Sequence, residues 1–268
     1  GFVFKAGLFN IGVAGQFLFG GFMAIYAGVS WNLPWWMCMI VAMIAGALWG
    51  AIPGIFKAFF NVNEVITSIM LNWAAVYLTR LIYYETPNII DKGHSSTYSL
   101  SDVNTSALLP TLGLDSLMNS LYINIGIIIA ILFAVLIYVI LEKTTFGYTI
   151  KACGYNKNAS TYAGINAKLV IILTLVIGGA LAGIGGSIYY QATTVQYKTE
   201  MSGLVNVVSA IGFNGIPVAL LAFSNPLGII ASSIFIGYLQ VGGVAMQPNY
   251  SSEMVNIILA VIIYFSAF

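Results

Sequence analysis

Carboxamides next to aromatic rings are the side chains of this sequence best suited to handling a small polar solute. An amide both donates and accepts hydrogen bonds, and an aromatic face stacks on a planar ring. Such pairs would suit a pathway for a polar, ring-bearing solute, whereas each residue alone could instead serve helix packing or an interfacial aromatic belt. The candidates are Asn10 beside Phe9, Gln16, Asn72 beside Trp73, and Phe213 beside Asn214.

Glu64 is an acid at the start of an apolar segment, within NVNEVITSIMLNW (residues 61–73). An ionisable group near membrane depth suggests proton or ion handling. The alternative is a helix-start acid that the N-terminal dipole stabilises. Asn72 follows eight residues later on nearly the same helical face, where its amide could bond a neighbouring helix or point into a pathway.

The residues needed for most enzyme chemistry are missing. The only histidine, His94, lies in a polar stretch and is expected to be solvated, and no G-x-x-x-x-G-K-[ST] phosphate loop occurs. Cys38 and Cys153 lack metal-ligand spacing and are expected to be free thiols. With a net charge of only +1, nothing points to nucleic acid. We therefore expect no enzyme activity and no cofactor or metal on this chain.

The elements that must hold these residues are membrane helices. Hydrophobic residues make up 60% of the chain and charged residues 6%, against about 25% charged residues in soluble domains. Apolar runs of about 20 residues recur, the length that a helix needs to cross a bilayer. The sequence therefore predicts an all-α, polytopic transmembrane helix bundle, one domain over residues 1–268, in which flanking N- and C-terminal segments are expected to be missing.

Seven spans are expected, and two of the connections between them are irregular. The segment 52–64 (IPGIFKAFFNVNE) is expected to break the second span, and FNGIP (213–217) and SNP (224–226) break a later apolar stretch into short helices. Broken helices at membrane depth require protein or a water-filled cavity beside them. The spans are placed at about 8–30, 34–52, 64–84, 121–141, 169–190, 226–241 and from 252 onward, with packing faces of small residues at 12–28 and 178–186.

The lysines set the orientation. The segment 142–168 holds four lysines, and Lys57 lies in the 53–63 turn. Because basic residues of short loops stay in the cytoplasm, both segments are expected there. The long polar stretch 85–120 is separated from each by one span and is expected outside the cell.

Five blocks of sequence, in this order, resemble the permease subunits of bacterial ABC importers in the branched-chain amino acid, ribose and nucleoside superfamily. The likeness covers nearly the whole chain and is greatest to the nucleoside or simple-sugar branch, although Ala14 stands where that branch often has an acid. The blocks are FNIGVAGQFLFGG (9–21), NVNEVITSIMLNW (61–73), KACGYNKNASTYAGIN (151–166), AGIGGSIYY (182–190) and GFNGIPVALLAFSNPLGI (212–229).

The resemblance implies a multi-subunit machine in the bacterial inner membrane. Its expected partners are a second related permease, two cytoplasmic ATPase subunits that bind ATP and Mg²⁺, an extracellular substrate-binding protein, and membrane lipid. It also implies that the 142–168 segment is the coupling loop that contacts the ATPase.

The residues of that loop suit a short docking helix. Asn156 or Asn158 can cap it and Gly164 can end it. A small-residue face with one aromatic side chain fits a groove, and the flanking lysines suit an acidic rim or lipid headgroups. The alternative is an ordinary loop that only sets topology. The face consists of Ala159, Tyr162 and Ala163.

The leading interpretation is a nucleoside permease of an ATP-driven importer, with a monosaccharide or a branched-chain amino acid as the runner-up substrate. A stand-alone secondary transporter that uses Glu64 would also suit broken helices. A third possibility is a membrane-assembly subunit without a pathway. Dependence of uptake on an ATPase or on an ion gradient separates the first two.

Overall fold

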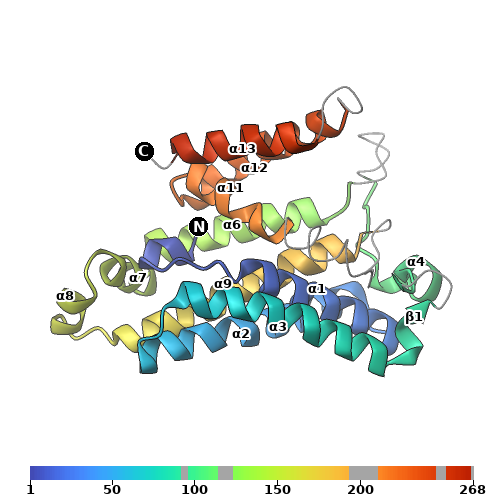
Figure 1. The fold of residues 1–268 in the computed structure, drawn as a ribbon, viewed down its shortest axis with the longest axis horizontal. Helices are drawn as coiled ribbons and strands as arrows, with labels where there is room; N and C mark the ends of the chain where they lie inside the picture. Colours follow the sequence, from blue (N-terminus) through green and yellow to red (C-terminus); the bar gives the residue numbers. More distant parts are fainter. Residues whose placement is uncertain (92–95, 114–122, 193–210, 246–251, 267–268) are drawn as a thin grey trace.

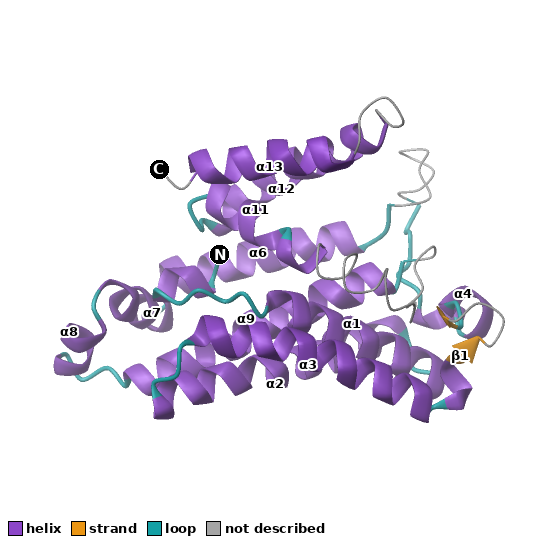
Figure 2. Ribbon diagram, in the orientation of Figure 1, coloured by secondary structure: helices purple, strands orange, loops and turns teal. Residues whose placement is uncertain are grey.

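The computed structural model describes residues 1–91, 96–113, 123–192, 211–245 and 252–266. Within these ranges the chain is helical except for one small hairpin (Figure 2). Six helices are long and apolar enough to cross a membrane, which confirms the predicted fold class. They are α1 (Val13–Ser30), α2 (Trp35–Phe60), α3 (Glu64–Glu85), α6 (Gly126–Lys143), α9 (Ala167–Tyr190) and α12 (Pro226–Ala245).

Helices α1, α2 and α9 form the centre of the bundle, and glycines allow their backbones to touch. A Cβ atom on Gly179 would lie 2.3 Å from the carbonyl oxygen of Gly46, and one on Gly183 would lie 2.2 Å from that of Ala42. Gly20 of α1 meets Gly183 in the same way, with 2.5 Å from its Cβ position to the Gly183 Cα. The predicted packing role of the small-residue faces is confirmed, since close approach is how membrane helices gain dispersion energy.

The C-terminal helices form a second layer beside this centre (Figure 1). The short helix α11 (Gly215–Leu221) precedes α12, and both pack against α13 (Ser252–Ser266), while α12 also packs against α6. The interruptions predicted at 213–217 and 224–226 are present: residue 214 is a turn, and Phe223 and Ser224 have φ near +50° between α11 and α12.

The expectation that residues 52–64 break the second span is wrong. Helix α2 continues through Pro53 to Phe60 and ends at Asn61, which adopts the left-handed conformation with φ 52°. Pro53 and Gly54 are buried, and Gly54 faces Ile172 of α9, so this turn of the helix has protein packed against it. A proline inside a membrane helix is tolerated where neighbours accommodate the lost hydrogen bond.

The remaining elements gather at the two ends of the bundle. At one end lie α7 (Thr145–Tyr155), α8 (Lys157–Tyr162) and the α2–α3 turn (Figure 1). The Lys168 Nζ lies 5.4 Å from the Phe59 ring centroid, so the two lysine-bearing segments meet. The other end holds η2 (Pro87–Ile89), β1 (Ile90–Asp91), β2 (Ser96–Thr97), α4 (Leu100–Val103) and η3 (Thr105–Ala107). The 3-10 helix η1 (Val3–Ala6), at the start of the described chain, lies beside α7 instead.

Candidate functional site

The amides at the start of α1 are buried and bonded to each other. Asn10 Nδ2 donates to Gln16 Oε1 at 3.0 Å, and Asn10 Oδ1 accepts from the Gly12 backbone N–H at 3.0 Å. Both side chains are only 1% exposed. Their mutual bond fixes the bend by which the chain enters α1.

A cavity of about 360 Å³ opens beside Asn10. Its walls come from η1, the start of α1, the middle of α9 and the α11–α12 pair, and its lining includes Val3, Asn10, Gly178 and Ala219. The wall on the α11 side begins at Gly215, directly after the half-buried Asn214. The structure therefore brings Asn10 and the broken segment at 213–217, through Gly215 and Ile216, to one cavity, whereas Gln16, Phe213 and Asn214 are not part of its lining.

Asn72 lies elsewhere and holds α1 to α3. Its Oδ1 accepts from the Gly15 N–H at 2.8 Å, and its Nδ2 donates to the Ile11 carbonyl at 3.1 Å. Gly15 is in the first turn of α1, where backbone N–H groups lack intrahelical partners. Asn72 thus caps a neighbouring helix, which favours the packing alternative for its amide. The adjacent Trp73 is 48% exposed and stacks on Tyr77 rather than facing the cavity.

Glu64 begins α3 and is ion-paired. Its Oε2 lies 2.8 Å from Lys57 Nζ, and the Glu64 side chain is only 12% exposed. The capping residue Asn63 accepts from the Val65 N–H in the same turn. These contacts match the helix-start alternative, and Glu64 is absent from the lining of the Asn10 cavity.

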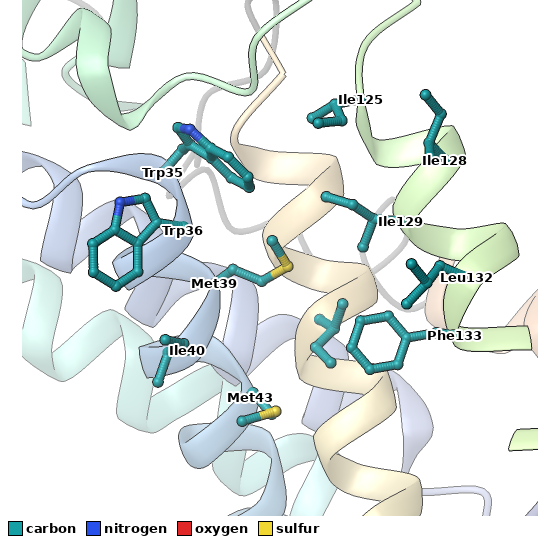
Figure 3. Close-up of a pocket in the computed structure, with 11 residues that line it drawn as sticks. Trp35, Trp36, Met39, Ile40, Met43, Ile125, Ile128, Ile129, Leu132 and Phe133 are labelled. Carbon is teal, nitrogen blue, oxygen red and sulfur yellow. The ribbon is translucent and has the colours of Figure 1, made fainter. Parts of the chain in front are cut away.

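A second cavity, of about 550 Å³, lies between α2, α6 and α9 (Figure 3). Trp35 and Met39 of α2 face Ile129 and Phe133 of α6 across it. The side chains around it are almost wholly apolar, so it offers no hydrogen bonds to a polar solute. Among the described residues, no group of three His, Cys, Asp or Glu side chains could hold a metal ion.

The 142–168 segment contains more helix than predicted. The expected short helix is confirmed as α8: Asn156 Oδ1 accepts from the backbone N–H groups of Asn158 and Ala159, both at 3.0 Å. Gly164, with φ 81°, ends it. Helix α7, which was expected to be loop, precedes it. Every residue of α8 except Ser160 is exposed, so the predicted face of Ala159, Tyr162 and Ala163 is accessible, with Tyr162 93% exposed.

Two buried amides that the sequence did not single out organise the opposite end. Gln191 Nε2 donates to the carbonyls of Trp35 at 3.0 Å and Ala107 at 2.9 Å, joining α9, α2 and η3. Asn104 Nδ2 donates to the carbonyls of Gly28 and Leu33. The only sequence signal was a lone amide just beyond an apolar span.

Membrane-length helices packed through glycine, with a broken segment beside a cavity that Asn10 lines, define a polytopic membrane protein. The comparison with known proteins is more specific. Residues 1–267 match the family model described as the permease component of branched-chain amino acid transport systems. The chain therefore belongs to this ABC transporter permease family.

Several relatives have named substrates. A guanosine ABC transporter permease protein of Bacillus subtilis is 35% identical over 99% of this chain and 75% of its own length. A nucleoside ABC transporter permease protein of Lactococcus lactis is 36% identical over 98% of this chain and 72% of its own. A glucose ABC transporter permease protein of Haloferax volcanii is 29% identical over 97% of this chain and 69% of its own length. No solved structure matches the chain.

Proposed function

We propose that this chain forms the solute pathway of an ATP-driven importer that carries nucleosides into a bacterial cell. The observation that carries the substrate class is the likeness, over almost the whole chain, to permeases named for guanosine and for nucleosides. The relative named for glucose is less similar. A monosaccharide is therefore the second candidate substrate, and a branched-chain amino acid, for which the family is named, follows it.

The pathway in this proposal passes the cavity at Asn10. Asn10 supplies the one side-chain amide that the described residues place in its wall, held in place by Gln16 and the Gly12 N–H, and Phe213 and Asn214 stand at the adjacent break before α11. Amide and aromatic groups together match the polar edge and flat face of a nucleobase. Trp73 and Glu64 lie outside this cavity, and their roles in the proposal are packing and ion pairing.

In this proposal, the energy of ATP hydrolysis reaches the permease through α8. The end of the bundle with α7, α8 and the α2–α3 turn lies in the cytoplasm, in accord with its lysines. Tyr162 projects there with Ala159 and Ala163 beside it, a shape suited to a groove on an ATPase subunit. The full transporter then contains a second related permease, two such ATPases that bind ATP and Mg²⁺, and an extracellular substrate-binding protein at the opposite end.

The experiment is uptake of radiolabelled guanosine, glucose and leucine into proteoliposomes that contain the complex purified with its ATPase. We expect guanosine uptake that requires ATP, persists when ionophores collapse all ion gradients, and is outcompeted by other nucleosides but not by glucose. Uptake that stops with the ion gradient and in Glu64→Gln, but needs no ATPase, would instead identify a secondary transporter. Preferred uptake of glucose would instead identify a sugar as the substrate.

A further inference from the structure

Helix α7 is held against two other elements by direct backbone contact. A Cβ atom on Gly147 would lie 2.2 Å from the carbonyl oxygen of Ile140, at the end of α6. One on Gly154 would lie 2.3 Å from the carbonyl oxygen of Lys5, in η1. The contact is mutual, because the Cβ position of Gly7 lies 3.0 Å from the Gly154 carbonyl oxygen. No side chain stands between α7 and η1 at this point, so neither can shift toward the other.

Apolar packing holds the same pair together on the adjoining surface. Ile150 and Cys153 of α7 belong to one buried core with Phe2, Val3 and Ala6 of the η1 region. Ile150 is fully buried. Close-packed interiors of this kind have low compressibility and transmit displacement. Helix α7 and η1, which lie side by side in Figure 1, should therefore move together.

Helix α8 joins this pair at Asn156 and through a side-chain contact. Asn156 ends α7 and caps α8, and the Cys153 Sγ lies 3.3 Å from the Ser160 Oγ across the joint. Ser160 is buried, whereas Tyr162 is exposed on the far side. A force on Tyr162 is thus delivered to α7, and through residues 163–166 to α9, rather than absorbed by a loose loop.

At its other face, η1 is part of the cavity wall. Phe2, Val3 and Phe4 line the cavity beside Asn10, and Ile216 and Ala219 of α11 line the facing side. A displacement of η1 relative to α11 would change the width of this cavity. The chain thus has an uninterrupted sequence of contacts from the exposed tip of α8 to the wall of the solute cavity.

We propose that Gly154 is a positioning residue for transport, which makes η1 follow α7 so that movement of α8 opens or narrows the cavity at Asn10. The inference rests on the proposed docking of an ATPase at α8. It adds a route by which the ATPase acts on the solute, through η1, beside the contacts that α7 makes with the spans α6 and α9.

The decisive variant is Gly154→Ala in the full transporter. Heavy atoms do not approach a Cβ closer than 3.0 Å, so the new methyl group must move η1 at least 0.7 Å from α7. We expect the ATPase to remain bound and active, while the number of ATP molecules hydrolysed per nucleoside imported rises about fivefold or more. The control is Gly237→Ala on α12, where no atom lies within 4 Å of the new Cβ, and its ratio should equal that of the wild type.

Each outcome has a defined meaning. A wild-type ratio in Gly154→Ala, even with less complex assembled, would overturn the inference, because a purely structural role lowers yield without altering the ratio. Tyr162→Asp serves as the separate test of ATPase docking. If Tyr162→Asp uncouples transport and Gly154→Ala does not, the docking proposal stands and the route through η1 is wrong. If Tyr162→Asp has no effect, the docking proposal itself fails.

A second measurement keeps Gly154 and covers the case in which Gly154→Ala does not fold. Spin labels are placed in pairs at Lys5→Cys with Asn158→Cys, and at Lys5→Cys with Phe223→Cys. The first pair joins η1 to α8, and the second joins η1 to the exposed turn between α11 and α12. Between nucleotide-free and ATP-bound complexes we expect the first distance to stay constant and the second to change. A change in the first with a constant second distance would overturn the inference.

Discussion

Replacing Asn72 by alanine should destabilise the protein without changing the choice of solute. The variant loses two bonds between α3 and α1, at 2.8 Å to the Gly15 N–H and at 3.1 Å to the Ile11 carbonyl. Side-chain hydrogen bonds between membrane helices contribute about 0.6 kcal/mol each and at most about 1.7. An N–H left without a partner adds roughly 1–3 kcal/mol when it is buried. Since this site is partly buried, we expect a loss of about 1–3 kcal/mol.

The assay is reversible unfolding in mixed detergent micelles, with guanosine uptake measured on the same preparations. The matched control is Trp73→Ala, which removes a larger side chain at the next position. Trp73 is 48% exposed toward the surroundings of the bundle, and lipid or detergent tails replace its contacts, so its loss should be clearly smaller. The reasoning is refuted if Asn72→Ala is as stable as Trp73→Ala, or if it alters the preference among nucleosides at unchanged stability.

Three further predictions concern packing and polar contacts. Gly183→Ala places a methyl group 2.2 Å from a carbonyl oxygen of α2, so the free energy of unfolding should fall by about 1–3 kcal/mol, or assembly should fail. The control is Gly185→Ala, where the nearest atom lies 3.7 Å from the new methyl group. In the same unfolding assay this variant should be neutral or slightly more stable. A double-mutant cycle on Lys57 and Glu64 should give a coupling at or above the roughly 0.2–1 kcal/mol of exposed pairs, and one that salt weakens little, because both side chains are mostly buried; a value near zero would mean that the pair does not form. Gln191→Leu should speed amide hydrogen exchange around the start of α2 and at η3, and unchanged exchange there would contradict its role as the link between these elements.

The sequence predicted the features that depend on composition and local spacing. Apolar runs located the long spans, except that α2 continues to Phe60 beyond its expected end near 52. The glycines at 178–186 marked a packing face because only small residues let helix backbones touch. The capped helix α8 followed from Asn156 and Gly164, whose roles are set by their immediate neighbours.

What the sequence did not predict depends on tertiary contact. Helix α2 passes through Pro53 because α9 packs against that turn, which local propensity does not reveal. Helix α7 looked like part of a lysine-rich loop because its apolar residues, such as Ile150 and Cys153, are few, and they are buried by segments distant in the sequence, among them η1 and α9. Whether Asn72 faced a pathway or a neighbouring helix depended on where Gly15 lies in space.

For the candidate pathway, too, the sequence predicted individual residues but not which of them come together. The sequence named Asn10 and the 213–217 break separately, and the fold brings both to one cavity. Glu64 was an ambiguous acid until the continuation of α2 brought Lys57 to 2.8 Å from it. Which of the chemically suitable residues lie at the cavity thus depends on the helix contacts that surround each of them.

The measurement that tests the account most directly is ATP-dependent guanosine uptake by the double variant Tyr162→Asp with Ala163→Asp. Both side chains are exposed, so the permease should fold and unfold as the wild type does. We predict that the ATPase no longer co-purifies and that uptake falls to the level seen without ATP. Wild-type uptake in this variant would contradict the claim that energy enters the transporter through α8.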